Sequence, residues 1–232
     1  MIIIPARLKS TRFPNKILAP INGIAMCIYT ALQAKKVDET IIVTDSDEVI
    51  NLAKEHNIKC VKSIKEHNSG TERIKEAADI LGLNDDEIII NLQADEPLFE
   101  KQNLLLFKDF ANKYKDEFFM ASCFSKINDY KDANAVKVVL DKDNYALYFS
   151  RANIPFNRDN TSNLIYLHLG IYAYSYKALK EFVSFTSVLE NIEKLEQLRA
   201  LENGKKIKML EINTKSFGID TKEDYERLMK LL

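Results

Sequence analysis

Residues 1–16 read MIIIPARLKSTRFPNK, a short apolar run followed by a loop that is rich in cations. The first five residues are typical of a β-strand that is buried on both faces, as the strands of parallel sheets are. The loop has four cations in ten residues: Arg7, Lys9, Arg12 and Lys16. In open parallel α/β sheets, ligands bind beyond the carboxyl ends of the strands. The loop therefore predicts a site for a polyanion, although a solvated basic turn would also explain the cluster.

Short apolar runs alternate with helix-length segments through the first half of the chain. The further runs are residues 39–44, 58–61 and 87–92. The segments between them with helical periodicity are residues 24–36, 47–56 and 71–81, and Asp47 looks like the N-cap of the second. This alternation predicts βαβ units with right-handed crossovers.

The second half changes in texture and predicts more strands. Strands are expected at residues 118–125, 135–140, 146–149, 166–174 and 206–212, with a hairpin around residues 141–144. Helices are expected at residues 189–203, closed by Gly204, and at residues 222–232. Residues 157–162 are polar and turn-rich, which predicts a mobile loop. The whole chain is therefore expected to form one doubly wound, mostly parallel, Rossmann-like α/β domain with a β-rich insertion.

Composition excludes several classes of protein. The 33 Lys and Arg residues nearly balance the 34 Asp and Glu residues, whereas proteins that grip a nucleic-acid backbone usually carry a basic excess. The three cysteines form no CxxC pair, which argues against a disulfide framework and suits a reducing cytosol. No stretch approaches the about 18 apolar residues of a membrane span, and no signal peptide is visible. We therefore expect a soluble cytosolic protein that binds neither nucleic acid nor membrane.

Three further motifs follow predicted strands. Ser69, Gly70 and Arg73 belong to an SGTER sequence that opens a helix and offers free backbone N–H groups, although a plain N-cap is an equal explanation. Asp95 follows the strand at 87–92, where a carboxylate is a common ligand for a hard metal such as Mg²⁺. Asp220 is either a second such ligand or the N-cap of the last helix. The chain lacks GxxxxGK[ST] and GxGxxG, which disfavours P-loop kinases and simple dinucleotide enzymes.

The motifs together resemble one family from Ile4 to Leu228. IPAR, STRFPNK, SGTER, NLQADEP, AVKVVLD, ALYFSRANIP, HLGIYAY, LEQLRALENG and GIDTKEDYERL are similar, in this order, to motifs of the 3-deoxy-manno-octulosonate cytidylyltransferases, or CMP-KDO synthetases. Two positions depart from the usual family pattern, since Ala94 and Asn15 stand where the family usually has glycine. Asn tolerates a left-handed backbone, whereas Ala94 would be strained if its φ were positive.

The resemblance implies a nucleotide-diphospho-sugar transferase fold and a Mg²⁺-dependent reaction of CTP with 3-deoxy-D-manno-octulosonate (KDO), for lipopolysaccharide biosynthesis. Arg7, Arg12 and Lys16 would hold the triphosphate, with Arg7, Lys16 and Asp95 as the catalytic groups. Asp95 and Asp220 would hold the metal, and Ser69, Gly70 and Arg73 would lie near the cytidine. The residues implied for the sugar are Gln93, Arg151, His168, Tyr172, Glu196 and Gln197. In the predicted helix 189–203, Glu193, Glu196 and Gln197 would share one face.

The family also commonly pairs as homodimers through the second-half insertion, here about residues 126–186, which would serve as a sub-domain for substrate and dimerisation. Two alternatives stay open. One is CTP-dependent activation of another sugar acid, either sialic-type or amino-KDO, because only the second-half motifs separate these substrates. The other is a non-catalytic nucleotide-binding protein of the same fold, which the paired metal carboxylates disfavour.

Overall fold

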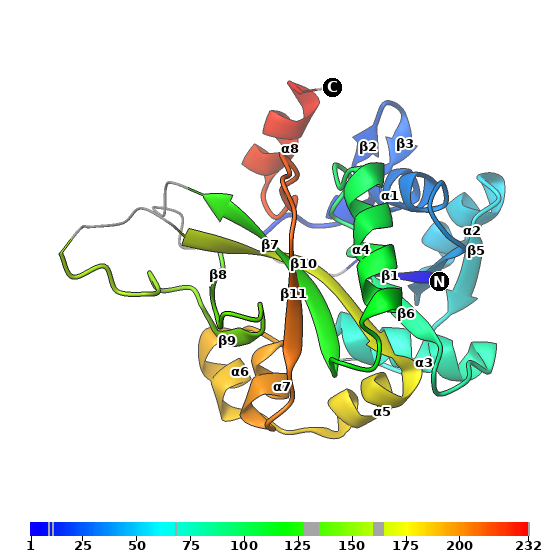
Figure 1. Cartoon of the computed structure of the whole chain (residues 1–232). Helices are drawn as coiled ribbons and strands as arrows, with labels where there is room; N and C mark the ends of the chain where they lie inside the picture. The colour runs from blue at the N-terminus through cyan, green and yellow to red at the C-terminus, as the bar shows by residue number, and fades with distance from the viewer. Residues whose placement is uncertain (9, 11, 68, 128–134, 160–164, 232) are drawn as a thin grey trace.

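A computed structural model describes residues 1–8, 10, 12–67, 69–127, 135–159 and 165–231. Its centre is a mixed sheet with the strand order β11-β7-β10-β6-β1-β4-β5 (Figure 1). These strands are β1 (Ile2–Ala6), β4 (Thr40–Thr44), β5 (Lys59–Lys62), β6 (Ile88–Asn91), β7 (Met120–Ile127), β10 (Ile165–Ser175) and β11 (Ile207–Glu211). Neighbouring strands are parallel except at β10, which is antiparallel to both β6 and β7. The predicted mostly parallel α/β fold is confirmed.

Helices cover both faces of the sheet, so the apolar runs are buried on both sides. One face packs against α1 (Met26–Ala34), α2 (Asp47–Glu55) and α4 (Lys101–Lys113). The other packs against α3 (Gly70–Leu81), α5 (Tyr176–Ser184) and α7 (Leu198–Glu202). Successive side chains of a strand point to opposite faces, so Ile2 and Ile4 of β1 belong to the first core and Ile3 to the second. No helix in the described ranges is long and apolar enough to cross a membrane.

The second-half strands form a nearly closed ring beside the parallel half of the sheet. β8 (Lys137–Leu140) pairs with β10 and with β9 (Ala146–Ser150), which confirms the predicted hairpin. The turn of this hairpin reaches β11, where Tyr145 bridges to Lys208 and Asn144 O accepts from Met209 N at 2.8 Å. Because β11 pairs with β7 and β7 with β10, the hairpin protects the open edge of the sheet.

Several predicted boundaries are wrong. Ser46, not Asp47, is the N-cap of α2, because the Ser46 side chain accepts from Val49 N. The helix expected at residues 24–36 begins at Met26, since β3 (Ile24–Ala25) pairs with β2 (Pro20–Ile21). The helix expected at residues 189–203 is two helices, α6 (Val188–Glu193) and α7, separated at Lys194 with φ 55°. The sequence patterns also missed α4 and α5.

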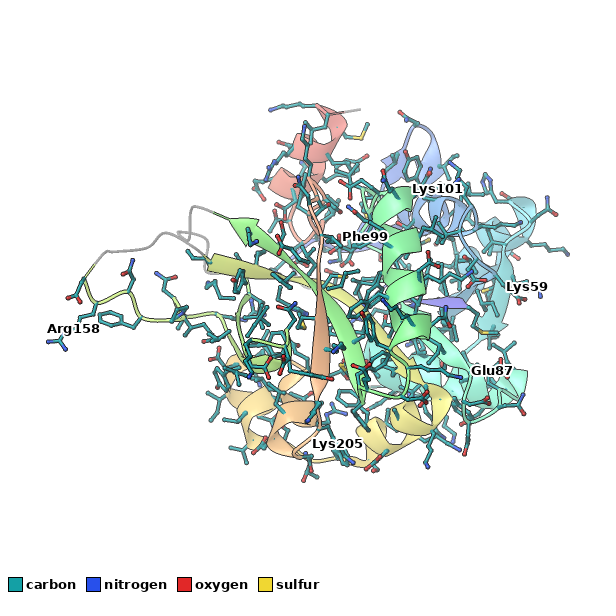
Figure 2. The ribbon with its side chains drawn as sticks, viewed as in Figure 1. Lys59, Glu87, Phe99, Lys101, Arg158 and Lys205 are labelled. Atoms are coloured by element: carbon teal, nitrogen blue, oxygen red, sulfur yellow. The ribbon has the colours of Figure 1, made fainter. Side chains whose placement is uncertain are left out.

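Residues 151–159, the segment that follows β9, extend away from the body of the molecule (Figures 1 and 2). Phe156 in this segment is 85% exposed, and Arg158 lies at its outer end in Figure 2. Of the loop predicted at residues 157–162, residues 160–162 lie outside the described residues. The last helix, α8 (Lys222–Met229), packs with the β2–β3 hairpin through a small third core.

Candidate active site

The carboxyl end of β1 opens into a hollow that gathers most of the residues predicted for the nucleotide. Its predicted lining residues are Arg7, Arg12, Lys16, Gly70, Arg73, Gln93, Asp95 and Asp220. They come from loops, and in the case of Gly70 and Arg73 from the start of α3, that follow different strands, as expected for the carboxyl edge of a parallel sheet. The cations after β1 and the two carboxylates, which are far apart in sequence, thus lie in one place.

Lys16 is held between the two carboxylates that were predicted as metal ligands. Its Nζ lies 2.5 Å from Asp95 Oδ2 and 2.9 Å from Asp220 Oδ1, and Arg12 Nη2 lies 3.0 Å from Asp220 Oδ2. Burial lowers the pKa of Lys16, but Asp95 and Asp220 more than offset it, so the pKa is raised above its ordinary value. Asn15 precedes the 3-10 turn Lys16–Leu18 with φ 56°, a left-handed backbone that Asn tolerates.

Asp220 lies just before α8 and is not its N-cap. The N-cap of α8 is Thr221, which forms a capping box with Asp224, so the N-cap alternative for Asp220 is wrong. Ile219 N donates to Asp95 O at 2.9 Å, which ties the segment before α8 to the loop after β6. Burial raises the pKa of Asp220, but Lys16 and Arg12 outweigh this effect and hold it below its usual range. The side chain is therefore an anion beside Asp95.

The pair of carboxylates fits a divalent cation. Both already contact one cationic atom, Lys16 Nζ, which occupies the position between them. No group of three or more His, Cys, Asp or Glu side chains suited to a metal occurs within the described part of the chain. Mg²⁺ is usually bound by one or two carboxylates with substrate phosphates and water, so two protein ligands suffice.

The start of α3 faces the same hollow. Ser69 is its N-cap and accepts from Glu72 N at 3.2 Å. A side chain at Gly70 would place its Cβ 3.1 Å from Pro5 Cγ, so glycine lets α3 approach the end of β1 closely. Arg73 donates to Asp45 through Nη2, while its buried Nη1 has no hydrogen-bond partner among the residues that the structure describes. Buried polar groups usually have a partner, so this nitrogen is an exception at the edge of the hollow.

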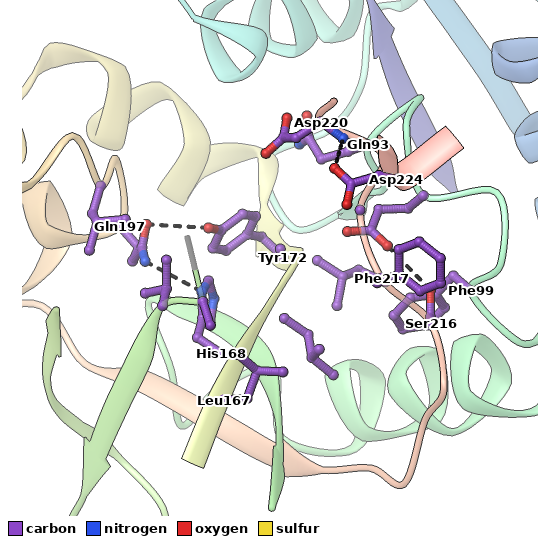
Figure 3. Close-up of a pocket in the computed structure, with 18 of the residues that line it drawn as sticks. Gln93, Phe99, Leu167, His168, Tyr172, Gln197, Ser216, Phe217, Asp220 and Asp224 are labelled. Atoms are coloured by element: carbon purple, nitrogen blue, oxygen red, sulfur yellow. Dashed lines mark hydrogen bonds between the residues drawn. The ribbon is translucent and has the colours of Figure 1, made fainter. Parts of the chain in front are cut away.

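A second hollow adjoins the first and gathers the residues predicted for the sugar. It is lined by five of them: Gln93, His168, Tyr172, Glu196 and Gln197 (Figure 3). Tyr172 Oη donates to Gln197 Oε1 at 3.3 Å, and Thr71 Oγ1 donates to Glu196 Oε2 at 2.6 Å. Glu196 Oε1 is buried and accepts no hydrogen bond from the described residues, although Arg199 Nη2 lies 3.5 Å from it. Burial raises the pKa of Glu196 above its ordinary value and lowers that of His168 to about 3.

Arg151 lies apart from this group. Its side chain is exposed, its Nε donates to Glu193 O at 3.1 Å, and it is not among the residues that line either hollow. Glu193 is the last residue of α6. Its carboxylate accepts hydrogen bonds from Ser150 Oγ and Arg151 N, so it binds the end of β9. The prediction that Glu193, Glu196 and Gln197 share one helix face is wrong, because helix α6 ends at Glu193 and Lys194 adopts a left-handed conformation.

Sequence reasoning missed several residues that line the second hollow: Glu96, Lys194, Ser216, Asp224 and Arg227. Glu96 lies in the NLQADEP motif, and burial together with the charge of Asp95 raises its pKa to about 8. Arg227 lies in the GIDTKEDYERL motif but was read only as part of a helix. Ala94 is buried and is not among the residues with positive φ, so its methyl group brings no backbone strain.

Comparison with known proteins places this arrangement in a family. The sequence profile of the cytidylyltransferase family matches residues 1–207. The chain is 51% identical to the 3-deoxy-manno-octulosonate cytidylyltransferase of a Nitratiruptor species, over 98% of both chains. It is 48% identical to the enzyme of that name from Wolinella succinogenes, over all of this chain and 98% of the relative.

Solved structures agree. The structure of CMP:2-keto-3-deoxy-manno-octonic acid synthetase complexed with CTP superimposes with a TM-score of 0.92 and 31% identity, over 99% of this chain and 96% of the other. A putative glucose-1-phosphate thymidylyltransferase from Bacillus anthracis shares the fold, with a TM-score of 0.68 and 15% identity over 99% of this chain and 94% of the other. The chain belongs to the 3-deoxy-manno-octulosonate cytidylyltransferases, a family of nucleotidyltransferases.

Proposed function

We propose that this protein couples CTP to KDO and releases pyrophosphate, giving CMP-KDO for lipopolysaccharide biosynthesis. One observation carries the proposal: Gln93 and Asp220 line both hollows. A cationic hollow suited to a triphosphate and a hydrogen-bonding hollow suited to a sugar therefore meet at these two residues. The reacting groups of two substrates would lie there together, and such proximity lowers the entropic cost of the reaction.

The chemistry asks for alignment and neutralisation of charge. The anomeric hydroxyl of the sugar acid attacks the α-phosphorus of CTP, and the bond to pyrophosphate breaks. Arg7, Arg12 and Lys16 hold the triphosphate and stabilise the negative charge that develops as pyrophosphate leaves. Mg²⁺, held by Asp95 and Asp220, would polarise the phosphate oxygens. In this site Lys16 stays protonated, since the neighbouring carboxylates raise its pKa.

The nucleotide and sugar contacts follow from the two hollows. Ser69, Gly70 and Arg73 stand at the start of α3, nearest the cytidine, and Gly70 and Arg73 line the first hollow. Gln93, His168, Tyr172, Glu196 and Gln197 bind the hydroxyl groups of the sugar acid. Arg151 was predicted to bind its carboxylate, and its exposed position beside α6 makes this the weakest of the proposed contacts.

Two further expectations stay proposals. We infer that two copies pair through residues 126–186, since Leu147 and Phe156 in this range are 59% and 85% exposed. Apolar side chains exposed to this degree suit an interface. The cytosolic location expected from the sequence also stays a prediction.

A pyrophosphate-release assay tests the proposed reaction. We expect release with CTP, Mg²⁺ and KDO, and little release when a sialic-type acid or amino-KDO replaces KDO. ATP or UTP in place of CTP, and chelation of the metal, are the matched controls. If pyrophosphate is released faster with another sugar acid, that acid and not KDO is the substrate. If no sugar acid gives release, a non-catalytic nucleotide-binding protein is favoured.

A further inference from the structure

Ser122 of β7 lies opposite an irregularity in β10 and contacts His168, which lines the second hollow. Leu169 pairs with Cys123 and Tyr172 with Ser122, so Gly170 and Ile171 have no partner in β7. The Ser122 side chain is fully buried, and its Oγ lies 2.7 Å from Ile171 O and 3.2 Å from Leu169 O. The same atom lies 2.9 Å from His168 Nε2. One hydroxyl therefore contacts both the bulge and the histidine of the sugar hollow.

These distances decide where the protons lie. A serine hydroxyl has one proton, and a carbonyl oxygen only accepts. An O···O distance of 2.7 Å requires a proton between the atoms, so Ser122 donates to Ile171 O. Ser122 Oγ must then accept from His168 Nε2. Since a neutral imidazole has one N–H, His168 Nδ1 is left as an acceptor. Burial lowers the pKa of His168 to about 3, which keeps the ring neutral.

The tautomer of His168 in turn fixes the side chain of Gln197. The amide nitrogen of Gln197 faces His168 Nδ1 at 3.4 Å, and its Oε1 accepts from Tyr172 Oη at 3.3 Å (Figure 3). The opposite tautomer would face Gln197 with an N–H and would favour a flipped amide. Phe149 packs against the His168 ring in a T-shaped arrangement, with centroids 4.8 Å apart.

The direction of this chain determines what Tyr172 offers to a ligand. Its only proton is directed to Gln197, so its oxygen presents lone pairs to the hollow. Burial also raises the pKa of Tyr172, so the phenol stays neutral. A neutral oxygen whose proton is already used accepts a hydrogen bond from a hydroxyl group and gives none to a carboxylate.

We propose that Ser122 is a positioning residue that acts through His168 and Gln197 to make Tyr172 a hydrogen-bond acceptor, so that this wall binds a hydroxyl group of the sugar acid rather than its carboxylate. The part about the sugar rests on the proposed function. The part about the protons does not, because it concerns atoms of the protein alone.

The proton positions can be measured without substrate. The chain has three histidines, so ¹⁵N-histidine labelling and correlation of ring nitrogens with ring protons will assign each tautomer. We expect His168 in wild type to be protonated at Nε2 only. Ser122→Ala should mix the two tautomers, and Ser122→Thr, which keeps the hydroxyl, should restore the single one. A wild-type His168 protonated at Nδ1, or an unchanged tautomer in Ser122→Ala, would overturn the proposal.

Kinetics tests the consequence for the sugar. Loss of a correctly oriented buried hydrogen bond corresponds to a change of about tenfold or more, so Ser122→Ala should raise the KM for KDO about tenfold. The KM for CTP should change by less than about twofold, as for a residue without contact to the nucleotide. Ser125→Ala removes another buried serine of β7 and is the matched control.

Equal increases in both KM values, or no rescue by Ser122→Thr, would show a merely structural role. If no sugar acid is a substrate, the proposed function fails, while the tautomer measurement still decides the role of Ser122.

Discussion

The two adjoining hollows are built in different ways. The first lies where parallel strands end, and its side chains are charged and joined in ion pairs such as Lys16 with Asp95 and Asp220. The second lies along the antiparallel strand β10 and at the break between α6 and α7, and the groups of its β10 wall, His168 and Tyr172, are neutral and buried. The comparison teaches that charge prepares the first hollow for a triphosphate, whereas the direction of hydrogen bonds prepares the β10 wall of the second for hydroxyl groups.

Asp95→Asn should have the largest effect, because the first hollow depends on charge. We expect kcat to fall at least about a thousandfold, or about 4 kcal/mol, since an amide neither neutralises Lys16 nor binds a hard cation well. The thermal midpoint should change little, because the carboxylate lies at the edge of the site rather than in the core. Asp109→Asn, which removes an exposed carboxylate of α4, is a control for nonspecific changes of charge. A variant that keeps more than about a tenth of wild-type activity would contradict the role of Asp95.

The difference between the hollows also explains what the sequence could predict. The ends of parallel strands are visible as apolar runs, so the residues after them, Arg7, Lys16 and Asp95, were placed by simple topology. The residues of the second hollow were named only through resemblance. Their positions depend on a bulge in β10 and on the backbone break at Lys194, and neither has a local signal of its own.

The missed elements have similar causes. Helix α4 carries Leu104 and Phe107 inward but also exposes Leu105 and Leu106, which blurs its amphipathic pattern. The closure of the β8–β9 hairpin onto β11 rests on long-range contacts, the bridge of Tyr145 to Lys208 and the hydrogen bond from Met209 N to Asn144 O, that no short sequence window contains. Ser122 looked like an ordinary strand residue, since its importance comes only from the carbonyls that the bulge brings to it.

Glu76→Gln should test whether the charge of Glu76 stabilises residues 63–67, the segment before α3. Burial raises the pKa of Glu76, but hydrogen bonds from Ser63, His67 and two backbone N–H groups outweigh it and lower the pKa to about 2. Because this value lies below the ordinary 4.5, the stabilisation is present above pH 4.5 and is lost as pH falls toward 2. At about 1.4 kcal/mol per pKa unit, we expect a loss of about 3 kcal/mol in the variant at pH 7.

Urea unfolding of wild type and Glu76→Gln at pH 7, 4.5 and 3 measures this difference, which should shrink at the lowest pH. Glu66→Gln changes an exposed carboxylate of the same loop and is the control. A difference that does not depend on pH would mean that packing, not ionisation, makes Glu76 important. The loop leads directly to Ser69, so a higher KM for CTP should accompany the loss of stability.

Arg151→Ala should have a smaller effect and would sharpen the border of the second hollow. Its guanidinium is exposed and donates to Glu193 O, so we expect the KM for KDO to rise by no more than about tenfold, or about 1.4 kcal/mol. CTP affinity, measured by calorimetry without the sugar acid, should change by less than about threefold. Arg158→Ala removes another exposed arginine of the same segment and is the control. A rise of a hundredfold or more would show that Arg151 reaches the sugar carboxylate and belongs to the hollow.

The smallest effect should appear at a hydrogen bond that joins α3 to a residue of the second hollow. Thr71 of α3 belongs to the nucleotide side, and its Oγ1 donates at 2.6 Å to Glu196 Oε2 on the sugar side. A double-mutant cycle of Thr71→Val and Glu196→Gln on kcat/KM for KDO should give a coupling of about 1 kcal/mol, as for residues that share a hydrogen bond. Thr71→Ser keeps the hydroxyl and should behave as wild type. Strictly additive effects would mean that the two hollows work independently, without energetic coupling through this hydrogen bond.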